Sequence, residues 1–164
     1  MAKITTGNKA PNFELQDLDS KRVSLQEALK RGPVAAAFFK VSCPVCQFTF
    51  PFLQRLFQAY ASDRTTFWAI SQDDARDTRD FCAEHGVTFP ALIDDDGYPA
   101  SNDYGITNVP TYYLIASDGT IKVDSVGFGK KALEKISEEL ARFLGRPVAP
   151  VFKPGEIVPD SKPG

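Results

Sequence analysis

The stretch of sequence that decides the fold is residues 38–51, Phe-Phe-Lys-Val-Ser-Cys-Pro-Val-Cys-Gln-Phe-Thr-Phe-Pro. It follows a run of small and apolar residues, 34–39, which predicts a buried strand. Its Cys-Pro-Val-Cys motif opens a long apolar segment that predicts a helix ending at about Tyr60. The two thiols, Cys43 and Cys46, are therefore expected at a helix N-terminus, one turn apart.

This placement gives the two cysteines different chemistry. A cysteine at a helix start faces unpaired backbone N–H groups and the positive end of the helix dipole, which stabilise its thiolate form. We therefore assign Cys43 as the nucleophile. Pro44 suits the first helical position, because its fixed φ matches the helix and its missing N–H would not be used there. Cys46 lies on the same face within disulfide reach, shielded by the next turn, and is expected to be the resolving thiol.

The composition limits the classes of protein to consider. With 164 residues, of which 43% are hydrophobic, the chain suits one packed domain. A net charge of -2 gives no reason to expect nucleic acid as a partner, and the sequence has no apolar run of about 18 residues that would predict a membrane span. Residues 1–10 lack the apolar region of a secretory signal, so the expected location is cytoplasmic, or extracytoplasmic if a signal peptide or anchor was removed.

Strands alternate with helices along the chain and end in a hairpin. Strands are predicted at 11–18 (an edge strand), 34–40, 66–71, 87–93, 112–116 and 121–126. Helices are predicted at 25–31, 44–60, 75–85, 99–104 and 130–144. This order implies a mixed sheet with helices on both faces. Five of the twelve prolines fall after residue 145, so we divide the chain into a domain, 1–144, and an extended or disordered tail, 145–164.

Several of these features resemble the thioredoxin superfamily. They are the strand followed by C-x-x-C, a proline (Pro51) five residues after the second cysteine, and Val109-Pro110-Thr111 opening a strand. Residues 7–15, the additional helix and strand between residues 74 and 93, and residues 104–111 resemble the TlpA/ResA-like thiol-disulfide oxidoreductases and their AhpC/TSA peroxiredoxin relatives. The likeness covers residues 7–144. It implies a thioredoxin-like three-layer α/β/α fold with a mixed central sheet and an N-terminal extension.

The resemblance also implies a site and a reaction. Pro110 would be a cis-proline beside the active-site disulfide, exposing the backbone of Val109 to an extended substrate segment. Pro44 and Val45 complete the substrate-binding set and would tune the reduction potential. The implied reaction is thiol–disulfide exchange with protein thiols or disulfides and an unidentified redox partner, using the Cys43–Cys46 disulfide and no further cofactor or metal.

The chain departs from the superfamily pattern around the motif. Ser42 stands where thioredoxins commonly carry tryptophan, and Ala37 where they carry a buried acid. Thr49 stands where ResA-like proteins can carry glutamate. Such an acid would deprotonate Cys46 during exchange, so its absence bears on the efficiency of turnover. Lys40 is the nearest charge in the sequence, and it either helps to hold the Cys43 thiolate or points into solvent.

Three other functions remain open. A peroxiredoxin places Thr or Ser three residues before its reactive cysteine, whereas here Cys43 precedes Cys46 and Lys40 precedes Cys43 at that spacing. Cys82 and His85 are spaced C-x-x-H and could complete a Cys₃His zinc set with the motif cysteines, although in a thioredoxin-like layout their helix should not point toward the motif. The third alternative is a non-catalytic binding module that keeps the fold, with the tail as its partner-binding segment.

Overall fold

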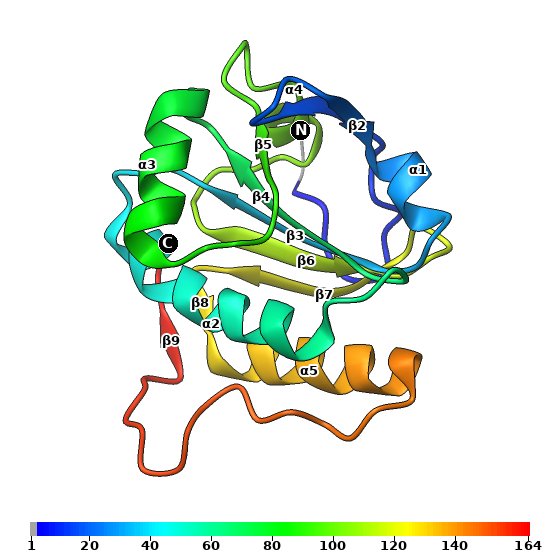
Figure 1. The fold of residues 1–164 in the computed structure, drawn as a ribbon, viewed down its shortest axis with the longest axis vertical. Helices are drawn as coiled ribbons and strands as arrows, with labels where there is room; N and C mark the ends of the chain where they lie inside the picture. The colour runs from blue at the N-terminus through cyan, green and yellow to red at the C-terminus, as the bar shows by residue number, and fades with distance from the viewer. Residues whose placement is uncertain (1–2) are drawn as a thin grey trace.

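A seven-stranded mixed sheet crosses the molecule between two layers of helices (Figure 1). The computed structural model describes residues 3–164, so residues 1 and 2 of the predicted domain lie outside the described part. The strands of the sheet are β1 (Glu14–Asp17), β2 (Arg22–Ser24), β3 (Val34–Phe39), β4 (Thr66–Ser71), β5 (Ala91–Ile93), β6 (Thr111–Ile115) and β7 (Ile121–Val126). A second sheet pairs β8 (Phe128–Gly129) with β9 (Ser161–Lys162). The helices are α1 (Leu25–Leu29), α2 (Pro44–Tyr60), α3 (Ala75–His85), α4 (Pro99–Asp103) and α5 (Lys130–Leu144).

The strand order is β2-β1-β5-β4-β3-β6-β7, with β3 near the middle. Strands β3, β4 and β5 run parallel, whereas β6 is antiparallel to β3 and β7 to β6. All six residues of β3 are buried, as expected for a strand with helices on both sides of its sheet. The predicted mixed sheet with two covered faces is therefore confirmed.

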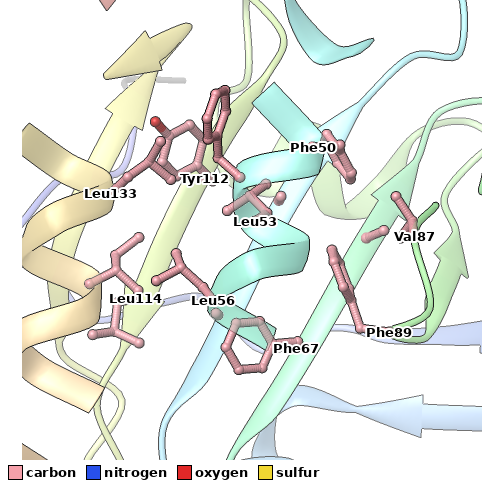
Figure 2. Close-up of a cluster of buried hydrophobic side chains, with 14 of the residues drawn as sticks. Phe50, Leu53, Leu56, Phe67, Val87, Phe89, Tyr112, Leu114 and Leu133 are labelled. Atoms are coloured by element: carbon pink, nitrogen blue, oxygen red, sulfur yellow. The ribbon is translucent and has the colours of Figure 1, made fainter. Parts of the chain in front are cut away.

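Alternate residues of β3 belong to two separate cores. Ala37 and Phe39 face the core formed with α2, α3 and α5, whereas Phe38 faces the core formed with α1, α4 and the N-terminal segment. Figure 2 shows the first core, with Leu53 of α2 between α5 and the segment that leads into β5. Helix α2 is thus packed from several sides, which fixes the direction in which its N-terminus points.

Three predictions about local structure were wrong. β1 is not an edge strand, because β2 pairs with its outer side and β5 with its inner side. The predicted strand 87–93 begins only at Ala91, since the Thr88 N–H donates to the Gln54 side chain at 2.9 Å. The polar side chains of the helix at 44–60 predict an exposed stripe that includes Gln54, but Gln54 is buried, with 7% exposed. Pro51 does lie on the exposed side of that helix, where its missing N–H costs least.

The tail, residues 145–164, begins at Gly145, the C-cap of α5, and takes an extended path packed on α5 and α2 (Figure 1). Val151 is buried against the α2–α5 core, with 4% exposed. Tyr60 joins α2 to the tail, because its hydroxyl oxygen accepts from Ala149 N–H at 2.8 Å and lies 2.6 Å from the Ser137 hydroxyl. Ser137 in turn donates to the Ala149 carbonyl at 2.6 Å. Within residues 3–164, no helix is long and apolar enough to cross a membrane.

We expect Tyr60→Phe to lower the free energy of unfolding by about 1–3 kcal/mol, because it leaves the Ala149 N–H without its acceptor. Urea denaturation followed by circular dichroism measures the change. The control is Tyr98→Phe, which removes the same hydroxyl from a residue that is 45% exposed and should change stability by less than about 0.5 kcal/mol. Equal effects of the two substitutions would contradict a stabilising role for the buried network.

Candidate active site

The Cys-Pro-Val-Cys motif forms the junction between β3 and α2. Cys43 is the N-cap residue of α2, and its sulfur accepts the Cys46 backbone N–H at 3.1 Å. Pro44 occupies the first turn of the helix, as predicted. The side chain of Cys43 is half-buried, whereas that of Cys46 is 0% exposed. Both are free thiols, so the structure shows the dithiol form of the motif.

The loop before β6 brings the second half of the predicted site to the cysteines. The Val109–Pro110 bond is cis, as the resemblance implied. The Cys43 thiol donates to the Val109 carbonyl at 3.4 Å. Thr111 fixes the loop by donating its hydroxyl to the Asn108 carbonyl at 2.6 Å. Residues 66 positions apart in the chain are thereby joined at the Cys43 sulfur.

Cys46 lies in surroundings that favour its protonated form. Burial raises the pKa of the Cys46 thiol well above the usual range, and contact with Cys43 raises the pKa further. No carboxylate among the described residues contributes to this shift. Thr49, at the position where relatives can carry an acid, is buried and donates its hydroxyl to the Val45 carbonyl at 2.7 Å. Among residues 3–164, no carboxylate is therefore placed to take the proton of Cys46.

Two side chains hold the loop that precedes Cys43. Asp73 accepts the Val41 N–H at 2.8 Å, and Gln47 donates to the Val41 carbonyl at 3.0 Å. From the sequence, either Asp73 or Asp74 could cap the following helix, but only Asp74 does so. Parallel neighbouring strands end at the same edge of a sheet, so an acid just after β4 could have been expected near the loop after β3.

A groove of about 320 Å³ lies on one side of the cis-proline loop. Lys40, Gln72, Asn108 and Val109 are among its lining residues. Lys40 is exposed and borders this groove. The groove is polar, because amide and hydroxyl side chains form most of its wall, and it offers hydrogen-bonding groups to a polypeptide placed beside the cysteines.

The zinc alternative is not supported by the positions of its four residues. Residues 3–164 contain no group of three or more Cys, His, Asp or Glu side chains arranged to hold a metal ion. Cys82 is half-buried on α3, and burial raises the pKa of its thiol to about 11. The His85 ring packs on Phe81, with 4.6 Å between the ring centroids. Both residues therefore serve the packing of α3.

Comparison with known proteins places this fold and motif in a family. The model of the AhpC/TSA family matches residues 6–124. The chain belongs to the AhpC/TSA family. It is 33% identical over 137 residues to the thioredoxin-like protein YneN of Bacillus subtilis, covering 80% of this chain and 78% of that protein. It is 28% identical over 143 residues to the thiol-disulfide oxidoreductase ResA of Bacillus thuringiensis, covering 87% and 78% respectively.

Solved structures confirm the predicted thioredoxin-like fold. The thioredoxin domain of a thiol-disulfide oxidoreductase from Bacteroides vulgatus superposes with a TM-score of 0.74 at 22% identity, covering 84% of this chain and 99% of that one. The peroxidoxin BcpB of Mycobacterium tuberculosis gives a TM-score of 0.66 at 21% identity, covering 87% and 97%. At such identities the likeness concerns the fold alone. The relatives named ResA confirm the predicted class, a thioredoxin-like oxidoreductase.

We expect iodoacetamide to modify Cys43 at least about tenfold faster than Cys46 at about pH 8, since only an exposed sulfur with access to its thiolate form reacts quickly. Mass spectrometry of peptides sampled over time gives both rates, with Cys82 as an internal comparison. Cys46→Ser should leave the modification of Cys43 intact, and Cys43→Ser should remove the fast phase. A fast phase on Cys46 would contradict the assignment of the two thiols.

Proposed function

We propose that this chain is a thiol–disulfide oxidoreductase in which Cys43 is the nucleophile and Cys46 the resolving thiol. The observation that carries the proposal is the setting of the Cys43 sulfur. It is half-exposed, lies at the N-terminus of α2, accepts the Cys46 N–H at 3.1 Å and lies 3.4 Å from the Val109 carbonyl. The backbone N–H and the helix dipole stabilise negative charge at that sulfur, both when it attacks and when it leaves.

The reaction proceeds through two exchanges. The Cys43 thiolate attacks one sulfur of a substrate disulfide, the substrate S–S bond breaks, and the other substrate sulfur leaves as a thiolate. The Cys46 thiolate then attacks the Cys43 sulfur, and the mixed disulfide breaks to release the second substrate thiolate. The substrate gains two electrons and the motif loses two, forming the Cys43–Cys46 disulfide. The reverse sequence oxidises a substrate dithiol, and neither direction needs another cofactor in the site.

The rim of the site suits a polypeptide substrate. Pro44 is exposed, and Val45 and Val109 are half-buried around the Cys43 sulfur. An extended segment of a partner protein can pair with the backbone of Val109, which places its own cysteine next to Cys43. Because they surround the Cys43 sulfur, we assign Pro44, Val45, Val109 and Pro110 to substrate binding. The redox partner that restores the motif is a second protein thiol or disulfide.

Variants of the motif test the roles of the two cysteines. Cys43→Ser should abolish reduction of a protein disulfide by the dithiol form, because no attacking thiolate remains. Cys46→Ser should stop the reaction at the mixed disulfide, which non-reducing electrophoresis detects as a covalent adduct on Cys43. Cys82→Ser should retain full activity, since that thiol lies on α3 and forms no three-residue cluster with the motif cysteines among the described residues. Exchange activity that survives Cys43→Ser would overturn the proposal.

The raised pKa of Cys46 predicts the pH dependence of the second exchange. Below its pKa, the thiolate fraction of a thiol rises about tenfold per pH unit, so resolution should accelerate about a hundredfold between pH 7 and 9. An aromatic disulfide whose leaving thiolate is coloured separates the steps, because one thiolate appears on attack and the second on resolution. Stopped-flow absorbance at several pH values gives the second rate, which Cys46→Ser should eliminate. A pH-independent second rate would indicate a base near Cys46.

Thiol peroxidase is the second candidate, because the family and the fold are shared with peroxidoxins. The spacing around the cysteines does not match the expected peroxiredoxin pattern, since Lys40 rather than Thr or Ser precedes Cys43 by three residues. Stopped-flow measurement of hydrogen peroxide consumption by the dithiol form distinguishes the two activities. A peroxide rate far above that of disulfide exchange would favour the peroxidase. If the protein shows neither disulfide exchange nor peroxide consumption, the remaining candidate is the non-catalytic binding module.

A further inference from the structure

The last residues of the tail reach the cis-proline loop. β9 (Ser161–Lys162) pairs antiparallel with β8, directly after the turn at Gly127. Gly127 itself donates its N–H to the Pro110 carbonyl at 2.7 Å, so the β7–β8 turn borders the cis-proline loop. We call residues 158–164 the cover. The cover thus extends the tail to the edge of the site that contains Cys43.

The contact between the cover and the site is made backbone to backbone. A methyl group added to Gly164 would lie 2.7 Å from the Val109 carbonyl oxygen, so only glycine fits at this approach. The side-chain amide of Asn108 also donates to the Gly164 carbonyl, at 3.3 Å. The Val109 carbonyl is the group to which the Cys43 thiol donates. The cover therefore lies on the same backbone edge that an extended substrate would use.

A charged side chain adds to this contact. The ammonium group of Lys162 lies 4.6 Å from the centre of the Phe48 ring, which belongs to the second turn of α2. Phe48 packs in turn on Phe128 of β8, with 5.0 Å between centroids. A cation over an aromatic face at an exposed site contributes a modest attraction. The cover consequently contacts α2, the cis-proline loop and β8 together.

A separate part of the tail, residues 149–156, holds the cover near the site. Arg55 of α2 forms two hydrogen bonds with the Glu156 carboxylate, at 2.7 and 2.8 Å, and a third with the Val151 carbonyl at 2.9 Å. The Arg55 side chain lowers the pKa of Glu156 to about 2, so the pair stays ionised at neutral pH. Together with the Tyr60 contact to Ala149, these bonds form what we call the anchor.

The cover is more exposed than the anchor, in which Val151 is buried. Residues 159–164 are all exposed, and β8 and β9 pair over two residues each. Short, exposed strand pairs are the first parts of a fold to open. A short tether keeps a released segment at an effective concentration on the order of millimolar beside its binding site. The cover can therefore open and return without any change in the anchor.

We propose that residues 158–164 compete with substrate for the Val109 edge, so that a polypeptide must displace the cover before its disulfide reaches Cys43. This inference rests on the proposed function, because it assigns a regulatory element to the same site. The cover requires no cofactor or covalent step. It raises the apparent KM for polypeptide substrates and affects small disulfides less, because a small disulfide reaches the sulfur without pairing along Val109.

The first test is Lys162→Glu in the full chain, which removes the cation over Phe48 and brings a carboxylate to the negative ring face. We expect kcat/KM for a protein disulfide to rise roughly threefold to tenfold, mainly through KM, as the closed population falls. The matched control is Lys135→Glu, the same charge change at an exposed position of α5, which should have no such effect. Unchanged or reduced kcat/KM in Lys162→Glu would overturn the proposal.

The second test does not depend on turnover. In Cys46→Ser, a cysteine-containing peptide is attached to Cys43 as a mixed disulfide, and 2-mercaptoethanol is attached in a parallel sample. We expect the peptide to shift the backbone NMR signals of residues 160–164 to the positions of a released segment, whereas the small adduct leaves them in place. Signals that stay in place with the peptide would show that cover and substrate bind separately. Displaced signals in this sample, together with an unsubstituted chain that shows no exchange activity, would instead reject the proposed function alone.

Discussion

The Cys46 N–H donates a hydrogen bond to the Cys43 sulfur, and this bond requires a rigid junction between β3 and α2. That bond exists because Cys43 has extended backbone angles while the next residue already begins a helix. β3 is hydrogen-bonded on both sides and buried along its whole length, so it delivers the chain to one fixed point. Asp73 and Gln47 then fix the backbone of Val41 before the turn. The sulfur is positioned by the sheet, and the helix provides its electrostatic surroundings.

The same helix makes the two cysteines chemically unequal. Its first residues face solvent, whereas one turn later Cys46 enters the core formed by α2, α3 and α5. Burial excludes water from Cys46 and disfavours its thiolate, and the hydroxyl of Thr49 is already used by the Val45 carbonyl. In the exchange that we propose, resolution therefore waits for Cys46 to lose a proton. A site of this kind holds a substrate in the mixed disulfide longer than one with a buried acid would.

Local patterns were sufficient to predict much of the fold, and non-local hydrogen bonds account for most of what they missed. The bounds of α2, α3 and α5 follow from caps, glycine stops and apolar periodicity, which act within a few residues. The cis bond at Pro110 came from the resemblance, because Val-Pro by itself favours trans. Gln54 could not be assigned from the sequence, since it bonds a backbone group more than 30 residues away, and Asp73 could be expected near the Val41 loop only from the parallel pairing of β3 and β4. Sequence patterns predict that a polar side chain is exposed, unless a hydrogen-bond partner elsewhere in the chain is already known.

The tail illustrates the same limit through its prolines. A proline-rich composition indicates a chain without regular structure, but it does not indicate a chain without a fixed path. Each proline restricts the unfolded tail and lowers the entropy lost on docking, so a few strong contacts can hold it. Arg55 and Tyr60 supply such contacts from α2, the helix that also carries both cysteines. The helix that carries Cys43 at its N-terminus therefore also holds, from its middle and its end, the tail that leads to the cis-proline loop.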